Sequence, residues 1–143
     1  MNDPQYLDQL RHSGAHLLAA AVMELWPSTK RAIGPSIDNG FYYDFDFLVP
    51  ISEADFPKIE KKMKEILKTW KGFEKIDVSP EEALEKVKGN DYKEELINEF
   101  SDKGEKLTFY KSGNFEDLCR GGHVEDPSKE IGAFKLLSIA GAY

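Results

Sequence analysis

The chain has 143 residues, of which 41% are hydrophobic and 12% aromatic, enough for one folded domain with a buried core. Its net charge of −7 argues against a free-standing protein that binds nucleic acid through backbone electrostatics. No run approaches the roughly 18 apolar residues of a membrane helix, and residues 1–10 lack the apolar core of a signal peptide. The single cysteine excludes an internal disulfide and mildly favours a reducing, cytoplasmic compartment.

Hydrophobic spacing and turn residues predict a mixture of helices and strands. We expect four helices: Leu7–Trp26, one from Ser52 with a buried stripe reaching Trp70, one that follows the Ser79-Pro80-Glu81-Glu82 capping box and ends at Gly89, and a short one capped by Asp91. We expect six strands: 32–37 and 41–47 joined by the Asp38-Asn39-Gly40 turn, then 73–78, 106–110, 115–118 and 133–139, with a turn at 126–128 before the last. This mixture favours an α+β domain in which an antiparallel sheet packs against helices.

All three histidines and the only cysteine occur in two short runs. His12 and His16 are four residues apart in the first predicted helix, so their side chains share one face. Cys119 and His123 have the same spacing in a glycine-containing segment that we expect to be a loop. Such an arrangement is rare by chance, and we predict that the two pairs meet in one site. The alternative for the helix pair is two half-buried histidines, each satisfied by a hydrogen bond.

These four side chains are compatible with three kinds of chemistry. Four ligands would close a tetrahedral zinc site of structural type, whereas three would leave a position for water, whose pKa on zinc falls to about 7. Without a metal, a histidine would act as general base on a water while the others bind the substrate or the leaving group. The spacing does not choose between metal and no metal, and nothing singles out Cys119 as an activated nucleophile.

Three further polar residues are candidates. Asp117 precedes Cys119 by two residues and would share its face of a strand, where it could orient a histidine or bind a substrate amine. The alternative is a solvated turn carboxylate. Tyr43 lies on the aromatic face of the strand 41–47 and belongs either to the core or to a pocket. Lys93, taken by itself, is typical of a surface lysine.

Four stretches of the chain closely resemble the editing domain of bacterial-type threonyl-tRNA synthetases. In order along the chain they are HSGAHLLAAAV, AIGPSIDNGFYYDFDF, DLCRGGH and AFKLLSIAGAY, which extend from His12 to Tyr143. The resemblance implies the fold known as the second additional domain, which alanyl-tRNA synthetases share in outline. Two residues depart from the family pattern: Gly14 stands where the family usually has cysteine or threonine, and Gly122 where it usually has proline.

The resemblance implies hydrolysis of the ester in seryl-tRNA(Thr), made by mistake on a separate aminoacylation domain. Serine differs from threonine by one methyl group, worth only about 1–3 kcal/mol of discrimination, so a second, hydrolytic site is needed. By motif, the pocket would be lined by His12, His16, Tyr43, Lys93, Asp117, Cys119 and His123. One of His12 or His16, with Lys93, would position or activate the water. Tyr43, Asp117 and His123 would bind the substrate, with Asp117 and His123 holding the serine or the terminal ribose.

The threonyl branch favours a site that requires no cofactor, although the alanyl relatives bind zinc with residues at the positions of His12, His16, Cys119 and His123. The alternatives are a zinc-dependent deacylase of the alanyl type and a non-catalytic module that binds the tRNA end. We expect residues 1–143 to form one editing domain cut from a longer cytoplasmic synthetase, without aminoacylation activity of its own. Its partners would be the acceptor end of tRNA(Thr) carrying serine, the aminoacylation core and the anticodon-binding domain.

Overall fold

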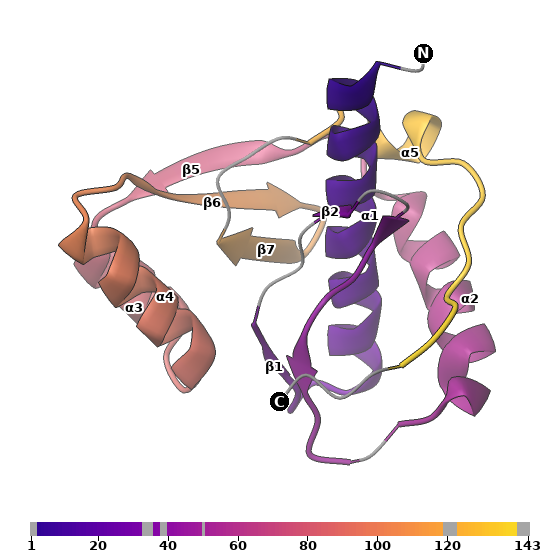
Figure 1. Ribbon diagram of the computed structural model, residues 1–143, viewed down its shortest axis with the longest axis horizontal. Helices are drawn as coiled ribbons and strands as arrows, with labels where there is room; N and C mark the ends of the chain where they lie inside the picture. Colours follow the sequence, from indigo (N-terminus) through magenta and orange to yellow (C-terminus); the bar gives the residue numbers. More distant parts are fainter. Residues whose placement is uncertain (1–2, 33–35, 38–39, 50, 119–122, 140–143) are drawn as a thin grey trace.

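The computed structural model describes residues 3–32, 36–37, 40–49, 51–118 and 123–139, and a long helix, α1 (Pro4–Leu25), runs through its middle (Figure 1). Helix α2 (Phe56–Leu67) packs along one side of α1, preceded by a 3-10 turn, η1 (Glu53–Asp55). On the other side lies an antiparallel sheet in the order β5-β6-β7, covered by two further helices. The expected α+β architecture, with small antiparallel sheets packed against helices, is confirmed.

The remaining elements are short. The sheet consists of β5 (Glu74–Val78), β6 (Leu107–Ser112) and β7 (Phe115–Leu118). The helices that cover it are α3 (Pro80–Lys86) and α4 (Asp91–Asp102), and a single turn, α5 (Pro127–Glu130), lies near the N-terminal end of α1 in Figure 1. Two small antiparallel ribbons complete the described part: β1 (Lys30–Arg31) with β4 (Phe45–Asp46), and β2 (Ser36–Ile37) with β3 (Gly40–Phe41).

The helix starts follow local capping chemistry. The side chain of Asp3 accepts from the N–H of Gln5, so α1 begins three residues before the predicted Leu7. The capping box at the start of α3 is confirmed, because Ser79 and Glu82 bond each other's backbone N–H. The predicted cap of α4 was wrong. Asn90 is the cap, with extended backbone angles and a side-chain oxygen that accepts from the N–H of Lys93.

Two strand predictions were wrong in extent. The stretch 41–47 is not one strand: only its ends pair, in β3 and β4, and between them the Asp44 carbonyl accepts from Ala32. Its aromatic alternation nevertheless holds, because Tyr43 is buried and the phenylalanines around it pack on the core. The predicted strand 32–37 is shorter than expected, with pairing at 30–31 and 36–37; residues 33–35 and the turn residues 38–39 lie outside the described part.

The C-terminal stretch also departs from prediction. Residues 126–128 do not form a simple turn, because Asp126 caps the one-turn helix α5 and the next two residues belong to it. Residues 133–139 form no strand, and in the described part of the chain they pair with no neighbouring strand. Instead, the N–H of Leu136 donates to the carboxylate of Glu60 on α2, and Phe134 and Leu136 pack on the core. The segment is therefore held by a hydrogen bond to α2 and by core contacts of its side chains.

The buried residues form two clusters with β7 between them. The first cluster contains one face of α1, with Ile59 and Met63 of α2, Trp70 and Tyr43. The second lies between the sheet and the pair α3–α4. Strand β7 contributes Phe115 to the first cluster and Leu118 to the second. The polar residues described next therefore lie where the two cores meet.

Candidate active site

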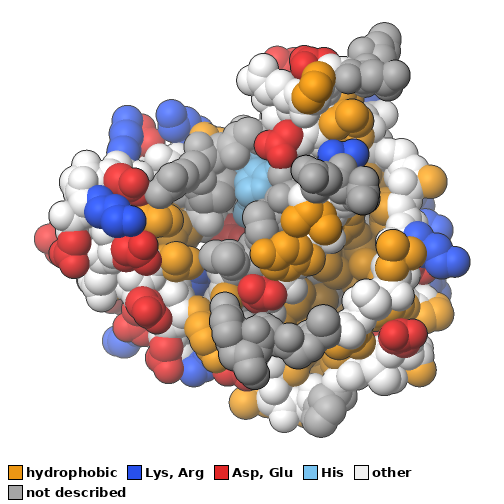
Figure 2. Space-filling model, in the orientation of Figure 1, with side chains coloured by type: hydrophobic (Ala, Val, Ile, Leu, Met, Phe, Trp, Pro, Cys, Tyr) orange, Lys and Arg blue, Asp and Glu red, His pale blue; other side chains and the backbone are white. Residues whose placement is uncertain are grey.

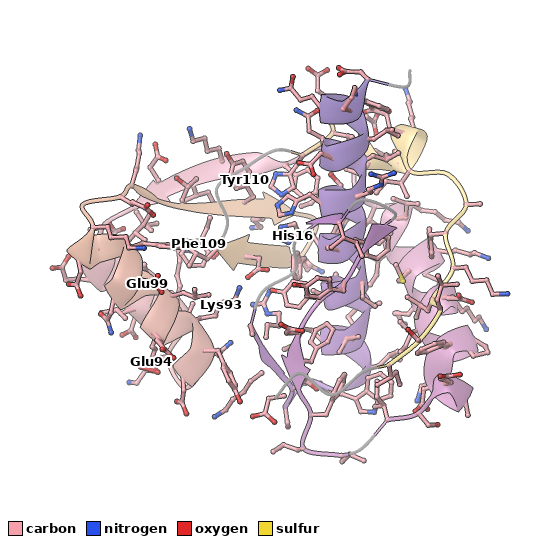
Figure 3. All side chains as sticks on the ribbon, in the orientation of Figure 1. His16, Lys93, Glu94, Glu99, Phe109 and Tyr110 are labelled. Atoms are coloured by element: carbon pink, nitrogen blue, oxygen red, sulfur yellow. The ribbon has the colours of Figure 1, made fainter. Side chains whose placement is uncertain are left out.

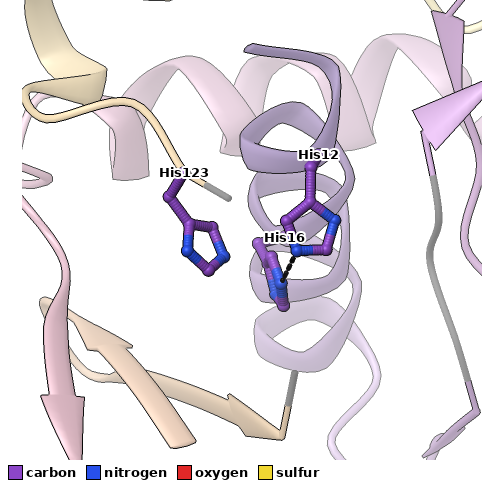
Figure 4. A group of neighbouring side chains, drawn as sticks. All are labelled: His12, His16 and His123. Carbon is purple, nitrogen blue, oxygen red and sulfur yellow. Dashed lines mark hydrogen bonds between the residues drawn. The ribbon is translucent and has the colours of Figure 1, made fainter. Parts of the chain in front are cut away.

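The three histidines come together although they belong to two distant segments. His12 and His16 project from the same face of α1, and His123 approaches them from the segment after β7 (Figure 4). The ring centroids lie 4.7 Å apart for His12 and His16, 4.7 Å for His12 and His123, and 4.9 Å for His16 and His123. The predicted convergence of the imidazoles is therefore confirmed. Cys119, the fourth predicted member, lies outside the described residues.

Burial differs among the three rings. His16 is 3% exposed and packs edge-on against Phe115, whereas His12 and His123 are half-buried. Phe73 stacks on His123 with ring centroids 4.1 Å apart and an interplanar angle of 24°. Figure 2 shows that histidine reaches the surface near the middle of the face turned to the viewer. The cluster thus has a buried ring beneath rings that a ligand can approach.

Asp117, on β7, lies against the buried His16 and is 2% exposed. Its Oδ2 accepts from the hydroxyl of Tyr43 at 2.5 Å and lies 3.4 Å from Nδ1 of His16. Its Oδ1 lies 3.0 Å from the ammonium of Lys93 and 3.5 Å from the guanidinium of Arg31, and it also accepts from the N–H of Leu118. Five donors of the described residues therefore surround one carboxylate, which exceeds its roughly four lone-pair directions.

The charges around Asp117 fix its protonation. Burial raises the pKa of the Asp117 carboxyl, but the Lys93 ammonium and the Arg31 guanidinium outweigh this effect, so its pKa lies far below the ordinary range. Burial, together with the neighbouring His16 and His12, lowers the pKa of His123 to about 2. At neutral pH Asp117 is therefore ionised and His123 is neutral.

The contacts of His16 link Asp117 to His12. Its Nδ1 lies 3.4 Å from Oδ2 of the ionised Asp117 and donates to this carboxylate. Its Nε2 lies 3.3 Å from Nε2 of His12, close enough for a hydrogen bond between the two rings. A chain of polarised contacts thus runs from Asp117 through His16 to the half-exposed His12.

Several alternatives from the sequence can now be decided. Lys93 is not a surface residue: it is 2% exposed, extends from α4 toward α1 in Figure 3, and its ammonium lies 3.3 Å from the hydroxyl of Tyr43. Asp117 is not a solvated turn carboxylate. Tyr43 packs in the core and also binds this polar group with its hydroxyl. Sequence reasoning missed Arg31, for which the sequence offers no signal, because a charged residue before a short strand is ordinary.

The donor set fits a metal ion. One nitrogen from each of His12, His16 and His123 can be chosen so that all three lie within 4.8 Å of one another. Imidazole nitrogens are ordinary zinc ligands, and a carboxylate on the second nitrogen of a ligating histidine is a common supporting contact, as Asp117 provides for His16. Three such ligands would leave a position for water.

Among the described residues, no helix is both long enough and apolar enough to cross a membrane. No model of a known protein family matches the chain.

Curated relatives match it along its length. It is 52% identical over 139 residues to the threonine–tRNA ligase of Lawsonia intracellularis. This alignment covers 96% of the present chain and 21% of the ligase. It is 51% identical over 145 residues to the threonine–tRNA ligase of Francisella tularensis subsp. novicida. This second alignment covers 100% of the present chain and 22% of the ligase. The chain is therefore homologous, over essentially its whole length, to one segment that makes up about a fifth of threonine–tRNA ligases.

Proposed function

We propose that this chain is the editing domain of a threonine–tRNA ligase, of the second-additional-domain type, and that it hydrolyses the ester of seryl-tRNA(Thr). One observation carries the proposal: His12, His16 and His123 converge above a buried carboxylate that also binds Lys93 and Tyr43. Such a cluster supplies a base, an oriented proton chain and fixed positive charge in one place. The homology to a fifth of a longer ligase supports a role beside a separate aminoacylation core.

The reaction is attack of a water on the ester carbonyl carbon. His12 positions that water and takes its proton, since it is the half-exposed ring at the end of the Asp117–His16–His12 chain. The oxygen of the water then bonds to the carbon, the ester C–O bond breaks, and the ribose oxygen leaves with the proton. The products are serine and uncharged tRNA. His16 orients His12 and stabilises its charged form.

Asp117 acts mainly from below the site. Because its oxygens already face five donors, it has little capacity left for a substrate amine, and we assign it the orientation of His16, Lys93 and Tyr43. Lys93, which is 2% exposed, supplies a fixed positive charge that keeps Asp117 ionised. The neutral His123 accepts a hydrogen bond from the amine or hydroxyl of serine, or from the terminal ribose, and Cys119 completes the wall of the pocket by motif.

The substrate reaches this site as the acceptor end of a tRNA bound elsewhere. A net charge of −7 disfavours binding of the tRNA phosphate backbone by this domain alone. The aminoacylation core and the anticodon-binding domain of a cytoplasmic ligase would hold the tRNA. The pocket discriminates by size: serine fits, and the extra methyl of threonine is excluded by crowding.

The metal-dependent alternative has a specific observation in its favour, namely the three imidazole nitrogens that fit zinc. Held by His12, His16 and His123, the ion would supply a water of lowered pKa. Metal analysis of the purified protein and assays with chelator separate the two mechanisms. Stoichiometric zinc together with chelator-sensitive deacylation would favour the metal enzyme, and full activity without metal would favour the histidine base.

The test of the function is a deacylation assay with seryl-tRNA(Thr) and threonyl-tRNA(Thr) side by side. We expect loss of the serine ester and survival of the threonine ester. His16→Ala should lower the rate by about 100-fold or more, because it removes the proton chain. Glu24→Ala, at an exposed position on the same helix, is the matched control and should leave the rate unchanged.

Two outcomes would contradict the proposal. Equal hydrolysis of both esters, or of neither at high protein concentration, would remove the editing function. If His12→Ala and His16→Ala lower the melting temperature sharply while the wild-type chain binds the tRNA end without hydrolysis, the cluster serves a non-catalytic binding module.

A further inference from the structure

Three consecutive residues join the first turn of α4 to the β1–β4 ribbon and to β7. Asp91 pairs with Lys30 at 3.6 Å, Tyr92 donates to Asp46 at 2.9 Å, and Lys93 reaches Asp117. The first two contacts are exposed at the surface and therefore contribute little to stability. The residue just before them, Asn90, makes a half-buried contact of another kind.

The side-chain amide of Asn90 bonds in two directions at once. Its Nδ2 donates to the carbonyl of Arg31 at 2.9 Å, and its Oδ1 accepts from the backbone N–H of Lys93 at 3.3 Å. Arg31 and Lys93 are the two residues whose cations face Oδ1 of Asp117, at 3.5 Å and 3.0 Å. One amide therefore holds the backbone of both residues that neutralise the carboxylate beneath the histidines.

We propose that Asn90 is a positioning residue for the hydrolysis, and that it sets the ammonium of Lys93 against Asp117. This inference rests on the proposed function for its catalytic consequence. Serine and aspartate cap helices as well as asparagine does, but ionised aspartate has no donor, and the serine hydroxyl is one bond shorter than the amide Nδ2 that reaches the Arg31 carbonyl. The capping contact alone thus does not explain the choice of an amide, whereas the double contact does.

The experiment separates capping from positioning. Asn90→Asp keeps the cap acceptor and has no donor for Arg31, Asn90→Ser keeps the acceptor on a shorter side chain whose hydroxyl lacks the reach of the amide Nδ2, and Asn90→Ala loses both contacts. The matched control is Ser79→Ala, which removes the cap of α3 at a helix that contributes no residue to the site. Each variant is assayed for melting temperature, for kcat and KM of seryl-tRNA(Thr) deacylation, and for the side-chain ammonium signal of Lys93 in a ¹⁵N-lysine NMR spectrum.

We expect Asn90→Ser to melt within a few degrees of the wild type, to lose about 10-fold to 100-fold in kcat with little change in KM, and to shift or broaden the Lys93 signal. Asn90→Asp should behave similarly, because its carboxylate would face the carbonyl of Arg31. Ser79→Ala should lower the melting temperature and leave both kcat and the Lys93 signal unchanged.

The inference is overturned if Asn90→Ser leaves the Lys93 signal as in the wild type, or if the loss of kcat in the Asn90 series only follows melting temperature, as for an ordinary cap. If the wild-type chain fails to deacylate seryl-tRNA(Thr), the proposed function fails, and the Lys93 signal still decides whether Asn90 positions the lysine.

Discussion

Replacing Asp117 by asparagine tests the charge arrangement at the centre of the molecule. The change keeps the size of the side chain but leaves the ammonium of Lys93, with a side chain 3% exposed, without its carboxylate. Arg31, at 21% side-chain exposure, can turn part of its charge toward solvent, whereas Lys93 cannot. The cost should therefore come mainly from the buried lysine.

The expected loss is large for a single substitution. Removing one partner of a buried ion pair costs about 3–5 kcal/mol, because the other charge stays buried without compensation. For a chain of this size, a loss of about 4 kcal/mol corresponds to roughly 10 °C in Tm. Lys93→Met should cost less, about 2–3 kcal/mol, because Arg31 still faces the carboxylate of Asp117 in that variant.

Urea unfolding of the wild type, of Asp117→Asn, of Lys93→Met and of the double variant gives a double-mutant cycle, which measures the coupling between the two residues. The double variant buries no ionised group of this pair, so it should be more stable than the sum of the single losses predicts, with a coupling of about 1–3 kcal/mol. Strict additivity of the two losses, or a loss below about 1 kcal/mol for Asp117→Asn, would refute the reasoning. Glu24→Ala again serves as the exposed control.

Three other predictions follow from the same contacts. Because folding lowers the pKa of His123 to about 2, this imidazole takes up a proton near pH 6.5 only in the unfolded state, which acid therefore favours. The free energy of unfolding in urea should fall by about 1 kcal/mol between pH 7 and 5.5, and this fall should be absent in His123→Gln. The pKa of Asp117 is depressed, so its stabilisation is present above pH ~4 and lost below it; acid titration followed by circular dichroism should show this loss in the wild type and not in Asp117→Asn. In Gly14→Ala the new Cβ would lie 2.9 Å from the Phe41 ring, so the free energy of unfolding in urea should fall by about 1 kcal/mol despite the better helix propensity of alanine. Adding Phe41→Leu should restore part of this loss, and a Gly14→Ala variant more stable than the wild type would contradict the packing.

Local chemistry in the sequence was enough to predict much of the framework. The side chains of His12 and His16 share a face because an α-helix has 3.6 residues per turn, and the capping box at Ser79 starts α3 through contacts three residues apart. Gly113, with φ of 57°, makes the tight connection between β6 and β7. These features depend only on neighbours in the chain, so their pattern is written in consecutive residues.

The tertiary structure alone decided how the site is built. Lys93 has the local pattern of a surface residue, and its burial follows from contacts with Asp117, 24 positions later, and Tyr43, 50 positions earlier. Arg31 and Asn90 join across 59 positions. The segment 133–139 has the composition of a strand, yet it pairs with no strand among the described residues, and the N–H of Leu136 donates to a glutamate of α2. Local pattern describes what a residue prefers among its neighbours, whereas burial and charge pairing depend on which distant segments the packed cores bring against it.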